Sequence, residues 1–342
     1  MLKEAQYYRQ EANQNVRCTL CPHGCLIADG KEGLCRVRGN RAGKLYALTY
    51  GQVVSAAIDP IEKKPLYHFY PGASTLSLGS IGCNLHCLHC QNWQISQCNM
   101  GQGEGMLQQL SPEAAAAKTR TVGAEILVFT YNEPSLWFEY ILDCAELALP
   151  AGIKLVMVTS GMINPQPLQE LLPVIAAYRV DVKGFTSEFY KKLTGFNVFD
   201  QVLANACTAF RQGAHVEMVT NLIPGWNDDE EQLRGLATWI RDDLSPAVPW
   251  HITRYIPYHR LKAPMTPVDR LELAERIGRE VGLEHIYIGN VPGHFAQDTH
   301  CAGCGALLIE RSGYTLRQNR LVAGCCPDCG ARLSVYRDGE TG

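Results

Sequence analysis

Apolar and β-branched runs alternate with amphipathic stretches over the central part of the chain. The runs occupy residues 75–79, 126–130, 153–159, 178–182, 214–220, 250–255 and 285–288. Between several of them the apolar positions recur at helical spacing, as in residues 112–121, 136–149, 228–240 and 267–281. Such alternation predicts parallel strands joined by helical crossovers, and therefore an α/β barrel or a doubly wound sheet.

The two ends of the chain follow other patterns. Residues 1–73 combine a cysteine cluster with Gly- and Lys/Arg-rich turns and short β-like stretches, and from residue 299 the alternation gives way to Gly/Cys turns. We therefore expect an N-terminal cysteine-rich metal-binding module with a β-rich lead-in (residues 1–73). A barrel (residues 74–298) and a C-terminal module (residues 299–342) follow it.

Composition narrows the class of protein. The chain has 342 residues, 46% of them hydrophobic, and a net charge of −3 with acidic and basic residues interleaved. This distribution provides neither a basic stripe for nucleic acid nor a polybasic membrane patch. The polar N-terminus does not resemble a signal peptide, and no apolar run is long enough to span a bilayer. We expect a cytoplasmic protein without a nucleic-acid or membrane partner.

Cysteine is unusually frequent, with fifteen residues. In a reducing compartment clustered cysteines indicate metal ligands before disulfides. Eleven of the fifteen form three clusters: Cys18, Cys21, Cys25 and Cys35; Cys83, Cys87 and Cys90; Cys301, Cys304, Cys326 and Cys329.

Polar residues follow successive predicted strands. The series is Cys83, Cys87 and Cys90, then Glu133, Ser160, Asp181 with Lys183, Asn221, Arg254, and Asn290 with His294. In parallel α/β barrels the chemistry gathers at the carboxyl ends of the strands. The series therefore predicts a shared active-site mouth.

The central cysteines have the form CxxxCxxC. Cysteines at this spacing could line one face of a helix as small core residues, but polar neighbours such as Asn84 and His86 weaken that interpretation. A zinc site completed by His86 or His89 explains the motif better than a helix face does. Three thiolates without another ligand suit an iron–sulfur cubane whose fourth iron is open, and we favour that interpretation.

A CxxxCxxC motif directly after the first strand of a parallel α/β array resembles the radical S-adenosylmethionine (SAM) superfamily, over roughly residues 74–295. The resemblance implies a partial parallel (β/α)6-type barrel that binds a 4Fe-4S cluster and SAM. In this superfamily SAM chelates the open iron, and one electron cleaves it to methionine and a 5′-deoxyadenosyl radical. That radical abstracts hydrogen from a substrate, and the protein supplies orientation and a dry site.

Further motifs narrow the resemblance to the pyruvate formate-lyase activating enzyme-like branch, and within it to the radical SAM enzyme of the AmmeMemoRadiSam system. They are FTYNEP (129–134), VTSG (158–161), DVKGF (181–185), LIPGWND (222–228) and GNVPGH (289–294). The N-terminal segments CTLCPHGCLIADGKEGLCRVR and DPIEKKPLYHFYPG are similar to that subfamily too, so the resemblance spans nearly the whole chain.

The resemblance also implies roles for single residues. Glu133 takes the place of the acidic residue that holds the SAM amino group, and Ser160 lies where the third strand contacts the ribose or carboxylate. Asp181 and Lys183 correspond to a D-x-K pair near SAM. His89 replaces the usual aromatic residue near the adenine. We add Asn221 to the expected SAM-binding residues as the next residue in the strand-end series.

The C-terminal cysteines form two CxxC knuckles, Cys301/Cys304 and Cys326/Cys329, around residues 305–324, which have the pattern of a β-hairpin. This pattern is typical of a zinc ribbon, in which one tetrahedral metal holds a small module together. Two redox-active pairs would be the alternative, but the strand-to-helix setting of such pairs is missing. Cys325 adjoins the second knuckle and is expected to be a spectator.

The N-terminal set Cys18, Cys21, Cys25 and Cys35 places four thiolates within 18 residues. This spacing suits either a structural zinc or a second iron–sulfur cluster, and slightly favours zinc. His23 is a possible substitute ligand.

Three functions compete on these grounds. The first is a radical SAM enzyme acting on a small molecule, with an electron donor such as flavodoxin or ferredoxin and with the other AmmeMemoRadiSam proteins as partners. The second is a glycyl-radical enzyme activase that acts on a protein backbone glycine. The third is a non-catalytic scaffold that keeps zinc in all three clusters.

Overall fold

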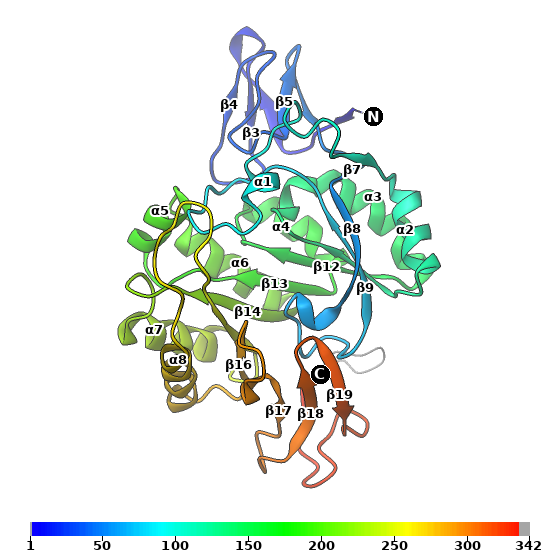
Figure 1. The fold of residues 1–342 in the computed structure, drawn as a ribbon. Coiled ribbons are helices and arrows are strands. Elements are labelled where there is room, and N and C mark those ends of the chain that lie inside the picture. The colour runs from blue at the N-terminus through cyan, green and yellow to red at the C-terminus, as the bar shows by residue number, and fades with distance from the viewer. Residues whose placement is uncertain (1, 335–342) are drawn as a thin grey trace. The chain divides into compact units, whose positions relative to one another are not determined.

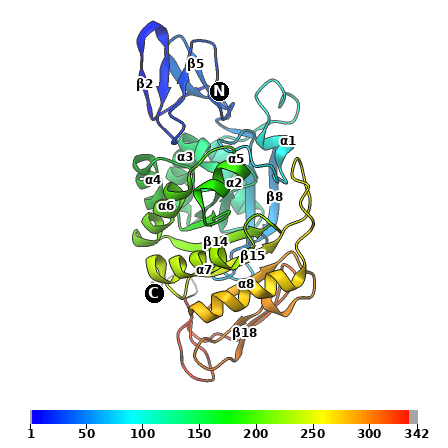
Figure 2. The same ribbon diagram turned by 90° about the vertical axis from the view of Figure 1, so that its left-hand side faces the viewer.

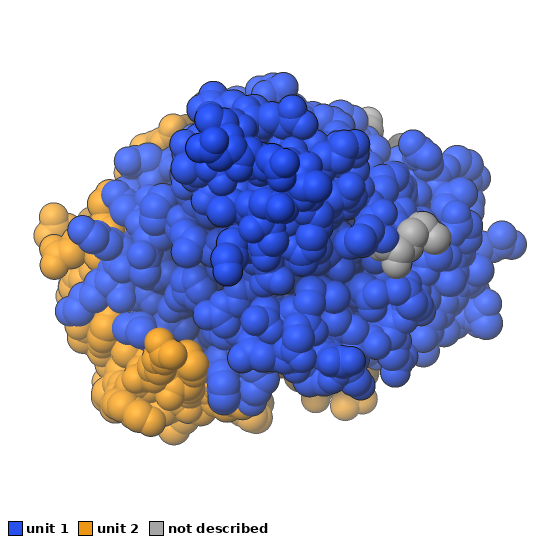
Figure 3. Space-filling model, turned by 90° about the horizontal axis from the view of Figure 1, so that it is seen from above, with its two compact units in different colours: residues 1–59, 74–178, 190–214 blue, residues 60–73, 179–189, 215–342 orange. Residues whose placement is uncertain are grey.

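The computed structural model of the chain describes residues 2–334. It comprises two compact units, each built from stretches that are distant in sequence (Figure 3). Unit 1 contains residues 1–59, 74–178 and 190–214. Unit 2 contains residues 60–73, 179–189 and 215–342.

The largest sheet has eight strands in the order β16-β15-β14-β13-β12-β11-β9-β8. Neighbouring strands are parallel in the pairs β9–β11, β11–β12, β14–β15 and β15–β16. The strands are β8 (Ser55–Pro60), β9 (Ser74–Gly79), β11 (Ile126–Phe129), β12 (Lys154–Thr159), β13 (Ala177–Asp181), β14 (His215–Leu222), β15 (Trp250–Arg254) and β16 (Ile286–Gly289). The predicted parallel α/β architecture is confirmed, because the seven apolar runs coincide with β9 and β11–β16 within two residues at each end.

Unit 1 combines strands β9, β11 and β12 with helices that follow or precede them (Figure 1). The helices are α1 (Trp93–Ser96), α2 (Pro112–Thr121), α3 (Phe138–Ala148), α4 (Pro165–Leu171) and α6 (Phe199–Arg211), together with the end of α5 (Ser187–Thr194). Helix α2 begins where its sequence predicts: the Ser111 hydroxyl accepts a hydrogen bond from Ala114 N at 3.2 Å, and Pro112 fills the first turn.

In unit 2, helices α7 (Glu230–Trp239) and α8 (Val268–Val281) pack against each other, and α8 contacts β15 and β16 (Figure 2). Asp229 caps α7 by accepting a hydrogen bond from Gln232 N at 3.0 Å. Gly278 lets α8 approach the sheet closely, since a Cβ atom there would lie 2.6 Å from Ile286 Cδ1. A larger residue at position 278 would push the helix away from its strands.

Short strands and turns make up the rest of the described chain. Residues 3–53 carry two three-stranded sheets, β1-β6-β5 and β2-β3-β4, and β7 pairs with β10. The C-terminal sheet has the order β17-β18-β19. These strands are β1 (Lys3–Glu4), β2 (Tyr8–Gln10), β3 (Val16–Cys18), β4 (Leu26–Ile27), β5 (Arg38–Arg41), β6 (Lys44–Ala47), β7 (Gln52–Val53), β10 (Gln108–Gln109), β17 (Thr299–His300), β18 (Leu307–Ser312) and β19 (Thr315–Asn319).

Short helices complete the element order. They are the 3-10 helices η1 (Ala12–Gln14), η2 (Ile61–Lys63), η3 (Pro134–Trp137), η4 (Leu149–Ala151), η5 (Leu172–Val174) and η7 (Phe295–Gln297), and the π-helix η6 (Ile240–Leu244). Within the described residues, every helix is too short or too polar to cross a membrane.

A polar network lies buried in unit 2 around Glu217 of β14. The Glu217 carboxylate accepts hydrogen bonds from Tyr67 N at 2.9 Å, His68 N at 2.7 Å, His215 Nε2 at 2.9 Å and His251 Nε2 at 2.6 Å. Burial alone would raise the pKa of Glu217, but the hydrogen bonds from both histidines outweigh it and hold the pKa well below its ordinary value. The network therefore contains a fully buried carboxylate whose charge is compensated within the unit.

Candidate functional site

The CxxxCxxC segment forms the loop that follows β9, and backbone hydrogen bonds attach it to two helices. Gly82, with φ +83°, donates from its backbone N to Ile95 O at 2.9 Å, and His86 N donates to Thr194 O at 2.9 Å. Cys83, Cys87 and Cys90 are half-buried, as is His89 between the last two. The loop thus presents its three thiols from a fixed backbone.

Two asparagines that were not predicted as site residues tie this loop to neighbouring strand ends. The Asn132 side chain, just after β11, donates to Ile81 O at 3.1 Å and to Gly82 O at 2.8 Å. Asn84, inside the motif and fully buried, donates to Met162 O at 2.7 Å in the loop after β12. The polar character of Asn84 within a half-buried motif was the available signal.

Glu133 and Ser160 are brought together in unit 1. Glu133 is 1% exposed, and its Oε2 accepts hydrogen bonds from Ser160 N at 2.9 Å and from Ser160 Oγ at 2.6 Å. Its Oε1 accepts from Thr159 Oγ1 at 2.6 Å and from Ser135 N at 3.1 Å. These four hydrogen bonds match the roughly four acceptor positions of a carboxylate, so the side chain is held in one orientation.

Electrostatics connect this carboxylate to the cysteine loop. Burial raises the pKa of the Cys83 thiol, and the nearby charge of Glu133 and the Cys87 thiol raise it further. Negative charge on Cys83 is therefore unfavourable unless a cation lies beside it. A bound metal cluster would supply that positive charge.

The predicted residues of unit 2 also form a connected set. Asp181, the last residue of β13, pairs with Arg179 and lies 3.2 Å from the Lys183 ammonium. Burial would raise the pKa of Asp181, but Arg179 and Lys183 together lower it. Asn227, 2% exposed, donates to Lys183 O at 2.7 Å and to Asn221 O at 3.0 Å, and so joins two strand ends.

Comparison with known proteins identifies the family. The sequence profile of the radical SAM superfamily matches residues 78–237, which include the CxxxCxxC loop. The uncharacterized protein MJ0808 of Methanocaldococcus jannaschii is 38% identical over 337 residues, which are 98% of this chain and 99% of that protein. The chain belongs to the radical SAM superfamily.

More distant relatives agree with this assignment. Pyruvate formate-lyase 1-activating enzyme of Escherichia coli K12 is 24% identical over 170 residues, covering 47% of this chain and 66% of that enzyme. The structure of a radical SAM methyltransferase from Sphaerobacter thermophilus matches with a TM-score of 0.50 at 18% identity, over 70% of this chain and 71% of that one, which shows a shared fold.

Membership makes the protein a radical SAM superfamily enzyme and excludes the expectation of a non-catalytic scaffold. It implies a 4Fe-4S cluster, SAM and a source of reducing electrons. The three half-buried thiols after β9 fit that cluster by donor type and number.

The C-terminal cysteines of this radical SAM enzyme meet at one point. Cys301 Sγ lies 3.6 Å from Cys329 Sγ, and Cys304 Sγ lies 3.7 Å from Cys326 Sγ. All four sulfurs lie within 4.8 Å of one another, whereas Cys325 is outside the set. This arrangement can hold one metal ion.

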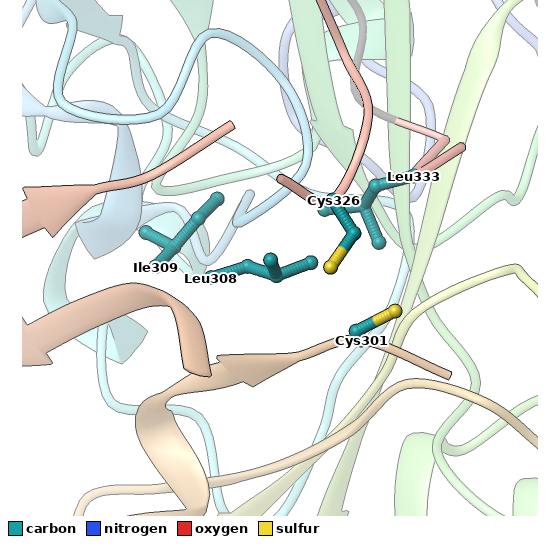
Figure 4. Close-up of a cluster of buried hydrophobic side chains, with 5 residues drawn as sticks. All are labelled: Cys301, Leu308, Ile309, Cys326 and Leu333. Carbon is teal, nitrogen blue, oxygen red and sulfur yellow. The ribbon is translucent and has the colours of Figure 1, made fainter. Parts of the chain in front are cut away.

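The two knuckles share one backbone geometry. Cys301 N donates to Ala306 O at 2.8 Å, and Cys326 N donates to Ala331 O at 2.8 Å. Cys301 and Cys326 are buried against Leu308 and other apolar residues (Figure 4), and the second cysteine of each knuckle is exposed. The apolar cluster of this module is small, and a metal at the four sulfurs would hold the two knuckles together.

The N-terminal cysteines of the enzyme line one hollow in unit 1. Its wall contains Cys18, Cys21, Cys25 and Cys35, together with His23, Arg38 and the apolar residues Leu20, Ile27 and Leu136. Burial and the neighbouring Cys35 thiol raise the pKa of Cys21 to about 12. The His23 ring shares a hydrogen bond with Asn84 O at 2.8 Å, which gives it a role in the contact with the CxxxCxxC loop.

Proposed function

We propose that Cys83, Cys87 and Cys90 ligate three irons of the 4Fe-4S cluster and leave the fourth iron for SAM. When bound, this cluster supplies the electron that cleaves SAM to methionine and a 5′-deoxyadenosyl radical, which abstracts hydrogen from the substrate. The observation that carries the proposal is the attachment of the cysteine loop, through Asn132 and Asn84, to the strand ends that bear Glu133 and Ser160.

Residues of unit 1 would then bind and orient SAM. We assign the SAM amino group to Glu133, whose buried charge near Cys83 attracts an ammonium group. Because the four acceptor positions of this carboxylate are filled, the Ser160 hydroxyl would rotate away from Oε2 to admit this group. Ser160 holds the Glu133 carboxylate and would contact the ribose or carboxylate of SAM. His89, half-buried beside Cys90, would pack on the adenine.

Unit 2 carries the other residues for which the family resemblance or the strand-end series implies a place near SAM. Lys183 offers a cation for the SAM carboxylate, and Asp181 fixes it at 3.2 Å. Asn221, whose side chain donates to Thr253 O and Oγ1 at 3.1 Å, would present a polar group at the end of β14.

We also propose that the C-terminal tetrad binds zinc. Four sulfurs at 2.3 Å from a tetrahedral zinc lie about 3.8 Å apart. The separations of 3.6 Å and 3.7 Å agree with this geometry.

The proposed substrate is a small molecule. The similarity to MJ0808 covers 98% of this chain, whereas the similarity to the activating enzyme of Escherichia coli covers 47%. The similarity to MJ0808 thus extends over both cysteine-rich ends of this chain. The small-molecule substrate is what the resemblance to the AmmeMemoRadiSam subfamily implies. A flavodoxin or ferredoxin would donate the electron to this enzyme. The other AmmeMemoRadiSam proteins would be partners of the enzyme, in a reducing cytoplasm.

A second candidate function is the activation of a glycyl-radical enzyme. The isethionate sulfite-lyase activating enzyme of Desulfovibrio desulfuricans is 24% identical over 184 residues, which supports this alternative. An activase would transfer hydrogen from a backbone glycine and leave a stable protein radical that electron paramagnetic resonance detects.

The test uses anaerobically reconstituted enzyme, dithionite and SAM. The wild type should form 5′-deoxyadenosine, and Cys83→Ala should not. Cys98 is buried but belongs to none of the three cysteine clusters, so Cys98→Ala should retain the activity. Deuterated small-molecule extracts that pass deuterium into 5′-deoxyadenosine would support the small-molecule proposal. Transfer only from a deuterated partner protein would support the activase instead, and no 5′-deoxyadenosine from the wild type would contradict both.

A further inference from the structure

The four N-terminal cysteines converge although they come from separate turns. Cys18 ends β3, and its backbone N donates to Cys25 O at 3.0 Å, which folds residues 18–25 into a closed loop. Gly24 N donates to Cys21 O at 3.2 Å inside the same loop. Cys35 comes from a turn that follows β4 in the chain, and all four cysteines line one hollow. Such convergence of free thiols in a reducing compartment indicates a metal site.

The spacing of the sulfurs distinguishes this site from the C-terminal tetrad. Among the residues that the structure describes, the C-terminal tetrad alone has three or more possible ligand atoms within 4.8 Å of one another. No three of the N-terminal thiols meet this condition, although all four line the same hollow.

A single zinc ion does not fit this spacing. Four sulfurs at 2.3 Å from a tetrahedral zinc lie about 3.8 Å apart. No three of the N-terminal sulfurs, all of which the structure describes, lie within 4.8 Å of one another. A cubane cluster carries its irons at separate corners and therefore holds its thiolates further apart than one ion does.

A buried cation faces the same hollow. Arg38 is 1% exposed and lines the hollow, and it pairs with the buried Glu139 through Nη2. Its Nε and Nη1 atoms have no hydrogen-bond partner among residues 2–334. Unsatisfied donors in this position are costly, and the sulfurs of a bound anionic cluster would accept their hydrogen bonds.

The N-terminal site lies against the CxxxCxxC loop within unit 1. A Cβ atom on Gly82 would lie 2.7 Å from Cys35 O and 2.5 Å from Val37 Cγ1, so only glycine fits between the two cysteine-bearing segments. The contact of His23 with Asn84 O closes the same boundary. The backbone next to Cys83 therefore packs against the backbone of Cys35.

From these observations we propose that Cys18, Cys21, Cys25 and Cys35 ligate a second 4Fe-4S cluster, with Arg38 as its buried hydrogen-bond donor. The cluster is bound by four cysteines, so unlike the proposed cluster at Cys83 it has no open iron for SAM. This assignment replaces the zinc that the cysteine spacing alone favours. It does not depend on whether the enzyme cleaves SAM.

The first test is the metal content of the full chain after anaerobic reconstitution with iron and sulfide. We expect about eight irons, about eight sulfides and about one zinc per chain. About four irons with about two zincs per chain would overturn the proposal.

The second test separates the two sites. The variant Cys83→Ala/Cys87→Ala/Cys90→Ala removes the half-buried thiols of the first site and should keep about four irons per chain, a brown colour and a reducible paramagnetic signal. A colourless triple variant of unchanged secondary structure would overturn the proposal. Failure of the wild type to form 5′-deoxyadenosine would leave this result unaffected, so the two proposals fail separately.

A single substitution gives the complementary result. Cys25 is half-buried, so Cys25→Ser perturbs the fold less than a change at Cys18 or Cys35. It should lower the iron content by about half, whereas Cys98→Ala should leave it unchanged. If Cys25→Ser retained all the iron and lost zinc instead, the site would be a zinc site.

Discussion

The substitution Glu133→Gln removes one buried negative charge while it keeps the size of the side chain. Each carboxylate oxygen of Glu133 accepts one hydrogen bond from a backbone N–H and one from a hydroxyl. In either orientation, the new NH₂ group of the glutamine therefore faces one backbone N–H and one hydroxyl. The hydroxyl can rotate and accept a hydrogen bond, but the backbone N–H cannot. One unsatisfied buried donor costs about 1–3 kcal/mol of the free energy of unfolding.

The effect on SAM separates a structural role from a binding role. If Glu133 holds the SAM amino group, loss of the charge-assisted hydrogen bond of about 1.5–3 kcal/mol weakens SAM binding by about 10- to 100-fold. Thr159→Val is the matched control. It loses the 2.6 Å hydrogen bond to the same carboxylate and leaves Gly161 N without its acceptor at 3.0 Å, but it keeps the charge. Its stability should fall by a similar amount, with SAM affinity within about threefold of wild type.

The assay is calorimetric titration of SAM into reconstituted, oxidised enzyme, in which SAM binds but is not cleaved, together with thermal unfolding of each variant. Equal losses of SAM affinity in Glu133→Gln and Thr159→Val would show that Glu133 acts only by supporting the strand ends. An unchanged affinity in Glu133→Gln would refute its assignment to the amino group.

Three further predictions concern other parts of the chain. Burial lowers the pKa of His285 from 6.5 to about 4. The contribution of neutral His285 to the free energy of unfolding is therefore fully present above pH 6.5 and is lost as the pH falls toward 4. Between pH 7.5 and pH 5 this contribution should fall by about 2 kcal/mol. Urea unfolding at the two pH values should show that His285→Phe loses less free energy of unfolding than the wild type. The control His300→Gln, at an exposed position, should lose as much as the wild type. Equal losses in all three proteins would refute the assignment of this pH dependence to His285. Cys304→Ser should abolish zinc binding without changing the iron content. Cys325→Ser, which lies outside the tetrad, should keep both metals. Zinc retained in Cys304→Ser would contradict the assignment. Gly82→Ala should lower the melting temperature and iron content more than Gly105→Ala, because both have positive φ but only Gly82 is crowded; equal effects would contradict the close packing.

The sequence predicted those parts of the structure that local patterns determine. The predicted strand at 126–130 and the helix at 267–281 correspond to β11 and α8 within one residue at each end. Alternation and capping act over a few residues, so these elements can be recognised without knowledge of the fold. The CxxxCxxC motif is a local pattern too, and its role as the ligand set of a cluster stays a prediction.

The partners of single polar residues could not be predicted in this way. Asn84 donates to a carbonyl 78 residues away, and Arg38 pairs with Glu139 across 101 residues. Such pairs depend on how distant segments meet, which no local pattern encodes. The metal at Cys18 and its three partners is a related case, because zinc and iron–sulfur sites share cysteine spacings and differ in the separation of the sulfurs.

The central claim is that the thiols after β9 hold the cluster that cleaves SAM. Its most direct measurement is the yield of 5′-deoxyadenosine from SAM and dithionite, compared between the wild type and Cys83→Ala after anaerobic reconstitution. We predict product from the wild type and none above background from Cys83→Ala, although that variant keeps the iron of the N-terminal site. Undiminished product from Cys83→Ala, or none from fully iron-loaded wild type, would contradict the account.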